Sequence, residues 1–274
     1  MSTPAGTTSN LKILEPTQHL LARRGFSMIE LLITMSIVAV LLGLLIPSLS
    51  YVRYAANGAV CATNLRQIGI GWRQYVDDHQ AMPFRADADW KYGGASFFGT
   101  DRRAVLASDR PMNGYVMTES EQESDRLAYL FRSPLDRGYR WTERSGKPAS
   151  QDVFPQPTVF ERFGTSYRAN PLLLDRRLLN PESSAGPIAE HEIQTMPSRT
   201  LLIAVPQWQI VVDREWRVEA SWHPEPDTGN VLFLDGSVRH TNFEEGLGTA
   251  YETVPYPVKG PRPRIGTPPI PWIY

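Results

Sequence analysis

An apolar segment near the N-terminus constrains this chain more than any other feature. From Leu31 to Ile46 no residue is charged, and a single carboxylate, Glu30, stands at the start of this run. The stretch from Phe26 to Leu49 is long enough to cross a hydrocarbon core of about 30 Å as a helix. A carboxylate beside such a run costs roughly 2.5–3.5 kcal/mol on insertion scales, so we expect Glu30 to have a function.

The residues in front of the apolar run form a pattern of their own. A basic pair, Arg23 and Arg24, is followed by Gly25 and Phe26, and Glu30 comes four positions later. This pattern resembles the type III signal of type IV prepilins and type II secretion pseudopilins. In that family a prepilin peptidase cleaves after the glycine, and the new N-terminal residue is methylated. The resemblance implies processing between Gly25 and Phe26, and an assembly role for Glu30 at the fifth mature position.

Other export signals fit the segment less well. An ordinary secretory signal has its small-residue cleavage site after an apolar stretch of about 7–15 residues. Here the stretch is longer, and the first such candidate, residues 55–57, lies well past Pro47. The residues before Cys61 lack the small neighbour of a lipoprotein site. A plain membrane anchor explains everything except Gly25 and Glu30.

Charge sets the expected orientation. Three basic residues and one acidic residue precede the apolar run, which favours a cytoplasmic N-terminus. We therefore expect residues 1–25 to be a cleaved cytoplasmic leader and residues 26–50 to be a single-pass helix in the inner membrane. The rest of the chain should be periplasmic, or be carried in a cell-surface filament.

Beyond the membrane segment the same helix should continue as an amphipathic helix over residues 51–80. Apolar residues recur at helical spacing from Leu65 to Val76, with charged residues on the other faces. The helix should end at about His79, before the next proline. Pro47 removes one backbone donor, and we expect it to kink the helix or to melt it locally.

A second resemblance covers the head. Residues 61–69 resemble a segment of a large bacterial subfamily of pilin-like proteins whose C-terminal signature is a histidine, nine residues and then Asp-Gly. Here eleven residues separate His223 from Asp235 and Gly236, so the loop carries an insertion. The subfamily often has a cysteine where Ser133 stands, which leaves the single cysteine without an obvious partner. Further pieces agree at residues 130–136, 166–170, 197–202 and 230–238.

The signature region has a physical interpretation as a β-hairpin. An apolar run over residues 230–234 is followed by Asp235-Gly236, a favoured type I′ turn pair, and then by alternating residues 237–240. Gly236 would supply the positive φ that this turn requires. We expect His223, Asp235 and Gly236 to act as turn and hydrogen-bond residues rather than in catalysis.

The fold class follows from these elements. Three further strands are predicted over residues 201–205, 209–212 and 216–222. The prediction is an α+β, pilin-like fold, in which a long N-terminal hydrophobic spine helix packs on the antiparallel β-sheet of a globular head over residues 81–250.

The sequence offers little catalytic chemistry. None of the five histidines has HExxH or HxH spacing, and no Gly-x-Ser-x-Gly elbow or phosphate-binding glycine loop is present. With 28 basic and 29 acidic residues, bulk charge gives no support to nucleic-acid binding. We therefore expect no enzymatic activity, no metal site and no nucleic-acid partner. Calcium at Asp87 and Asp89, or at Asp227 and Asp235, is a minor alternative.

Two regions are less defined. Residues 90–156 are rich in loops and have no assigned role. Residues 251–274 form a Pro-rich tail, which either docks on the head through Trp272 and Tyr274 or remains a free extended segment.

Two functional classes remain open. The first is a structural subunit, a pseudopilin or minor pilin. It would be processed by prepilin peptidase and assembled with other pilins through its N-terminal helix into a type II secretion or type IV pilus-like filament. The second is a membrane-anchored surface adhesin or carbohydrate-binding protein that uses the pilin-type signal for export.

Overall fold

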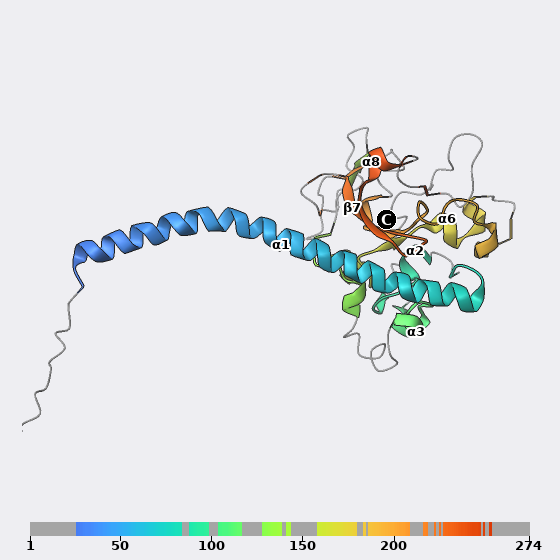
Figure 1. Ribbon diagram of the computed structural model, residues 1–274. Coiled ribbons are helices and arrows are strands. Elements are labelled where there is room, and N and C mark those ends of the chain that lie inside the picture. The colour runs from blue at the N-terminus through green and yellow to red at the C-terminus, as the bar shows by residue number, and fades with distance from the viewer. Residues whose placement is uncertain are drawn as a thin grey trace, which may run out of the picture. The chain divides into compact units, whose positions relative to one another are not determined.

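The chain divides into two units, residues 1–50 and residues 51–274, which are described separately below (Figure 1). The leader, including Gly25, and the tail from residue 254 on lie outside the described residues, as does His223. The computed structural model describes residues 26–83, 88–98, 104–116, 128–138, 141–143, 158–179, 183–184, 186–208, 216–218, 222, 225, 227–247, 249 and 252–253.

One long helix, α1, runs from Met28 to His79. Pro47 lies inside it, and the helix continues through this residue. The local melting that the sequence suggested is therefore absent, because the loss of one donor removes a single bond from a helix that is long on both sides of it. The kink stays a prediction.

In the second unit α1 is amphipathic, as predicted. Its buried residues lie on one face and include Leu65, Ile68, Trp72 and Val76. The helix ends at His79 because Gln80 adopts a left-handed φ of 54° and its N–H donates to the carbonyl of Val76.

The head contains an antiparallel sheet of four strands in the order β4-β5-β7-β8. These strands are β4 (Arg168–Ala169), β5 (Leu201–Ala204), β7 (Thr228–Phe233) and β8 (Val238–Asn242). A register shift interrupts the β5–β7 pairing between Leu201 and Ile203. The antiparallel head and the strand near residues 201–205 are confirmed, whereas residues 209–212 lie outside the described part.

Two smaller antiparallel pairs complete the strands of the described residues. They are β1 (Phe97–Phe98) with β2 (Ala104–Val105), and β3 (Trp141–Glu143) with β6 (Trp216–Val218). The strand predicted from residue 216 is thus present, but it pairs with β3 and not with the main sheet.

Short helices connect the strands. The α-helices are α2 (Ala88–Lys91), α3 (Asn113–Val116), α5 (Val159–Phe163), α6 (Pro171–Leu174) and α8 (Phe243–Gly246). The 3₁₀ turns are η1 (Ala107–Asp109), η2 (Ala128–Phe131), η3 (Arg176–Leu178) and η4 (Glu190–Glu192). Polar N-caps start several of them: Thr158 forms a capping box with Glu161, while Asn170 and Asn242 accept backbone N–H bonds at α6 and α8.

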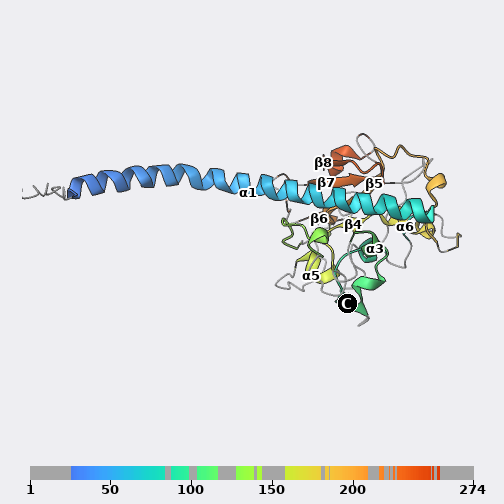
Figure 2. The same ribbon diagram turned by 60° about the horizontal axis from the view of Figure 1, so that its bottom comes forward.

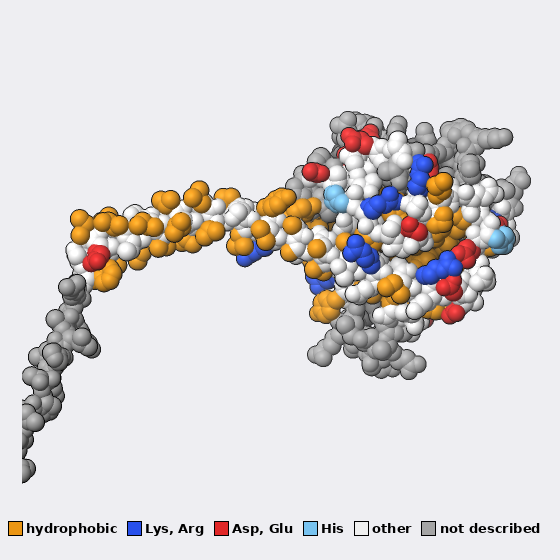
Figure 3. All heavy atoms as spheres, viewed as in Figure 1, with side chains coloured by type: hydrophobic (Ala, Val, Ile, Leu, Met, Phe, Trp, Pro, Cys, Tyr) orange, Lys and Arg blue, Asp and Glu red, His pale blue; other side chains and the backbone are white. Residues whose placement is uncertain are grey.

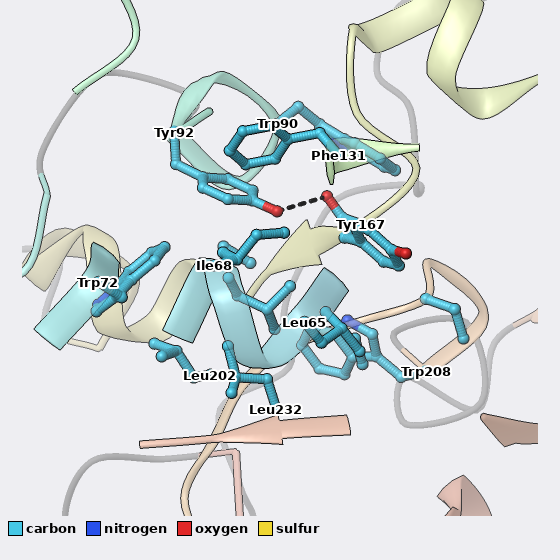
Figure 4. Packing of buried hydrophobic residues seen from close by; sticks show 14 of the residues in the cluster. Leu65, Ile68, Trp72, Trp90, Tyr92, Phe131, Tyr167, Leu202, Trp208 and Leu232 are labelled. Carbon is cyan, nitrogen blue, oxygen red and sulfur yellow. Dashed lines mark hydrogen bonds between the residues drawn. The ribbon is translucent and has the colours of Figure 1, made fainter. Parts of the chain in front are cut away.

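The second part of α1 forms the centre of the head. β7 lies on one side of it and α3 on the other in both orientations (Figures 1 and 2). Leu65 and Ile68 project between Leu202 and Leu232 of the sheet and the rings of Tyr92 and Phe131 (Figure 4). The hydroxyl of Tyr92 donates to the carbonyl of Tyr167 over 3.3 Å, which satisfies this buried polar group. The α+β pilin-like architecture is therefore present in the head.

Part of the loop-rich region is held by one buried guanidinium. Arg110 is 1% exposed and donates to the carbonyls of Trp90, Gly93 and Phe163. Its guanidinium also lies 5.1 Å from the centre of the Phe97 ring. The described part of residues 90–116 is thus packed structure, which the polar composition did not predict.

Candidate functional site

The predicted processing and assembly residues lie at the beginning of α1. The helix starts at Met28, so Phe26 and Ser27 precede it, and Glu30 lies in its first turn. The Ser27 N–H lies 3.5 Å from Oε2 of Glu30 and donates to it. The first turn of a helix carries partial positive charge, which favours a carboxylate at this position. The beginning of the helix therefore offsets part of the cost that Glu30 would have in an apolar surround.

The first part of α1 exposes apolar surface on all sides. Every described residue from Phe26 to Ser50 is exposed. Figure 3 shows hydrophobic side chains along this helix, with one acidic group near its beginning. α1 is long and apolar enough in this part to cross a membrane. A helix that is apolar all round requires either lipid or other helices as its surroundings.

Four hydroxyl groups in this segment are bonded within the helix. Thr34, Ser36, Ser48 and Ser50 each donate to a carbonyl three residues earlier, at 2.7–2.8 Å. In hydrocarbon an unpaired hydroxyl costs several kcal/mol, so such bonds suit a lipid environment. These four hydroxyl groups therefore present no free donor to their surroundings.

The second predicted site, the signature hairpin, is present with a different turn. β7 and β8 pair from Thr228↔Asn242 to Leu232↔Val238. The Gly236 N–H donates to the carbonyl of Phe233, and the Phe233 N–H donates to the carbonyl of Ser237.

These two bonds define a three-residue loop, Leu234 to Gly236, and not the expected two-residue type I′ turn. Gly236 has a φ of 82°, whereas Asp235 is not among the residues with positive φ, as a type I′ turn would require. The Asp235 carboxylate accepts from the N–H and the hydroxyl of Ser237 at 2.9 and 2.6 Å. Asp235 therefore braces the turn locally, and the role of His223 stays a prediction.

Three of the segments of the second resemblance, residues 130–136, 166–170 and 230–238, meet around Cys61. This thiol is fully buried, and the side chains of Tyr167, Asn230 and Ser133 lie next to it. Burial raises the pKa of the Cys61 thiol above its ordinary value. Ser133, where the second resemblance led us to expect a cysteine, is therefore beside Cys61, although the two are far apart in the sequence.

One carboxylate joins two of the same segments. Asp136 accepts from the N–H groups of Val159 and Phe160 at 2.9 and 2.8 Å, and from the hydroxyl of Ser166 at 2.5 Å. It thereby caps α5 and ties residues 130–136 to residues 166–170. The sequence pointed to these pieces only by resemblance, since a lone Asp in a loop predicts no partner.

Two glycines of α1 were also missed. A Cβ on Gly69 would lie 2.8 Å from Cδ1 of Leu232, and one on Gly71 would lie 2.3 Å from Cγ1 of Val116. Glycine inside a helix is unfavourable by roughly 0.5–1 kcal/mol relative to alanine, so two on the apolar face could have signalled close packing.

The calcium alternatives gain no support from the described part of the chain, where no three His, Cys, Asp or Glu residues form a metal-ligating group. Asp87 lies outside this part, and so does the side chain of Asp89. The Asp235 carboxylate is engaged with Ser237.

Comparison with known proteins identifies the N-terminal segment. A family model described as the prokaryotic N-terminal methylation motif matches residues 20–46. Neither a curated protein nor a solved structure matches this chain. The matched residues include Gly25, Phe26 and Glu30, so the chain carries a type IV prepilin-type signal. The match ends before the head, and the C-terminal His and Asp-Gly signature stays a prediction.

Proposed function

We propose that this chain is a pilin-like structural subunit, a pseudopilin or minor pilin that is stored in the inner membrane and assembled into a filament. The observation that carries the proposal is α1 itself. Its first part carries a prepilin-type signal and exposes mainly apolar side chains, with Glu30 as its charged residue, and its second part supplies the core of an α+β head.

Processing is the first step of the proposed function. Prepilin peptidase removes residues 1–25 and leaves Phe26 as a methylated N-terminus on the cytoplasmic side. The helix stays in the membrane because the cut precedes the apolar run. The head is then held outside the inner membrane by a single span.

Assembly is the second step. Packing of the exposed helices against those of other pilins removes their apolar side chains from lipid and pairs the groups that hydrocarbon disfavours. The Glu30 carboxylate of one subunit meets the N-terminal amine of Phe26 in its neighbour. A pair of opposite charges offsets the desolvation that each would bear alone.

Mass spectrometry of the membrane-extracted protein tests this function. The expected mature form begins at a methylated Phe26 and is recovered together with other pilins in a sheared filament fraction. In Gly25→Ala the full-length precursor should accumulate, because a side chain at the scissile position hinders the peptidase. A mature form that begins beyond Pro47 would show that ordinary signal peptidase processes the chain and would end the proposal.

A second function is favoured by one surface cluster of the head. The Tyr75 and His79 rings stack with centres 4.1 Å apart, and Tyr115 packs edge-on against Tyr75. The Tyr115 hydroxyl donates to Oδ2 of Asp78 at 3.0 Å. Partly exposed aromatic rings beside a carboxylate suit sugar binding by an anchored surface protein. Retention of the wild-type protein, but not of Tyr115→Ala, on immobilised glycans would support this function.

A further inference from the structure

A groove lies within the head between α1 and the β7–β8 turn. It encloses about 480 Å³, within the range of small-ligand and peptide pockets. Three segments form it: α1 from Arg66 to Val76, the chain from Glu190 to Pro197, and the strands and turn that carry Leu202 and Phe233–Gly236. All of them belong to the second unit.

The floor and walls of the groove are mainly apolar. Trp72, Leu202 and Phe233 are buried at its base, while Ile70 on the α1 wall is 62% exposed. An isoleucine this exposed on a helix that otherwise packs well marks a surface suited to an apolar partner.

Charged side chains surround this apolar surface, and they differ in whether they form ion pairs. Arg73 is paired with Asp77 and Glu190. Arg66, by contrast, makes no ion pair with any described residue. The exposed Asp235 carboxylate accepts hydrogen bonds only from Ser237 among the described residues. The groove thus offers one guanidinium and one carboxylate to whatever occupies it.

The last described residues before the C-terminal tail, Glu252 and Thr253, lie next to the strand that carries Leu202 of the groove. Glu252 forms a parallel bridge with Thr200, and the carbonyl of Thr253 accepts from Nδ2 of Asn170. Thr200 also accepts the N–H of Leu234, which lines the groove. The described chain thus ends at Thr253, and Glu252 pairs with the same residue, Thr200, that Leu234 contacts from the other edge.

The composition of the tail complements the groove. The segment 268–274 reads Pro-Pro-Ile-Pro-Trp-Ile-Tyr, and it is joined to Thr253 by residues 254–267. Residues 254–274 contain Lys259, Arg262 and Arg264 and no acidic residue. The apolar side chains of the tail can pack on the floor of the groove, and an aromatic ring can stack on the guanidinium of Arg66. The basic side chains of the linker carry the charge opposite to that of Asp235.

We propose that residues 268–274 dock in this groove, with the linker 254–267 crossing its Asp235 side. An extended linker of this length reaches about 3.1 Å per residue, more than enough to span the groove. Proline-rich segments lose little conformational entropy on docking, and a short tether gives an effective concentration of about millimolar. The tail thereby covers an apolar surface of the head, a role separate from the assembly of the N-terminal helices.

Site-directed spin labelling of the full chain in detergent micelles tests the proposal. A nitroxide at Thr267→Cys reports the mobility of the tail next to the docked segment, and the native Cys61 is fully buried and does not take the label. The expected spectrum is dominated by an immobile component. Adding Ile70→Glu places a carboxylate in the groove, and the spectrum should become predominantly mobile.

Val60→Glu is the matched control, because Val60 is 49% exposed on the same helix and does not line the groove. This variant should leave the immobile component unchanged. A mobile label in the otherwise wild-type protein overturns the proposal, as does an immobile label that Ile70→Glu does not release. Immobilisation that disappears on dilution with unlabelled protein would assign the groove to a second copy, and would also overturn it.

Discussion

Gly69 of α1 lies so close to β7 that a Cβ built on it would stand 2.8 Å from Cδ1 of Leu232. Real Cβ atoms essentially never approach another heavy atom so closely. The absence of a side chain at residue 69 therefore sets how near the helix and the sheet can come to one another, and Leu232 is fully buried at the contact.

Gly69→Val should destabilise the head by about 1–3 kcal/mol, because the added carbons overpack a buried contact. Gly58→Val is the control in the same helix, since a Cβ at Gly58 meets nothing within 4 Å. It should change stability by less than about 0.5 kcal/mol. Urea unfolding of the two variants measures the difference, and equal midpoints would contradict the close contact.

Gly236→Val should destabilise the head by roughly 1–3 kcal/mol through backbone strain. Gly236 has a φ of 82° and open space around its Cβ position, so a steric clash with neighbours does not contribute. Gly236→Asn should destabilise the head much less, because asparagine tolerates the left-handed region. Thermal melts compare the two, and a valine variant that melts like wild type would rule out the loop geometry.

Glu30→Val should leave membrane insertion intact or slightly improved and should impair incorporation into a filament. The carboxylate costs roughly 2.5–3.5 kcal/mol in the bilayer, and on the proposed function it recovers this only against a partner's amine. Alkaline extraction of membranes measures insertion, and recovery in sheared filaments measures assembly. Assembly of Glu30→Val at wild-type levels would refute the pairing.

Ser133→Cys should form a disulfide with Cys61 under oxidising conditions. The Ser133 side chain lies next to the Cys61 thiol, and both residues are buried. A bond that closes a loop of this length should stabilise the head by roughly 2–4 kcal/mol. Mass spectrometry with and without reductant detects the bond, and Ser133→Ala is the control. A variant that keeps two free thiols after oxidation would contradict the juxtaposition.

Stability should fall in acid partly through Glu192. The Ala189 N–H donates to this carboxylate at 2.8 Å, and Arg176 pairs with it at 2.5 Å. These bonds, that from Ala189 first, hold the pKa of Glu192 below its ordinary value. Between the pKa of Glu192 in the folded chain and its higher pKa in the unfolded chain, the unfolded chain binds more protons. The stability that Glu192 contributes is therefore complete above about pH 4.3, and it is lost as the pH falls through the pKa of the folded state.

Urea midpoints across the acid range measure this effect. Glu192→Gln should be less stable than wild type near neutral pH and should show a shallower acid dependence. Glu225→Gln, at an exposed glutamate that forms no ion pair with a described residue, should retain the wild-type slope. If the urea midpoints of wild type and Glu192→Gln depended on pH in the same way, Glu192 would not contribute to the loss of stability in acid.

The periodicity of the apolar residues was sufficient to predict the helix and much of the sheet. The repeat from Leu65 to Val76 predicted which face of α1 is buried, and the apolar run before Asp235 predicted a strand and a hairpin. Such patterns are local, because a helix or strand must place its apolar residues on the face that is covered.

The sequence by itself determined the N-terminal signal, since the motif consists of Gly25, Phe26 and Glu30 at fixed positions relative to one apolar run. Only the tertiary structure decided which distant residues meet. It placed Ser133 beside Cys61, Asp136 at the start of α5, and Gly69 against Leu232. It also replaced the expected two-residue turn by the loop ending at Gly236. The physical reason is that such contacts depend on how the elements pack in three dimensions, and the spacing of residues along the chain carries no record of that packing.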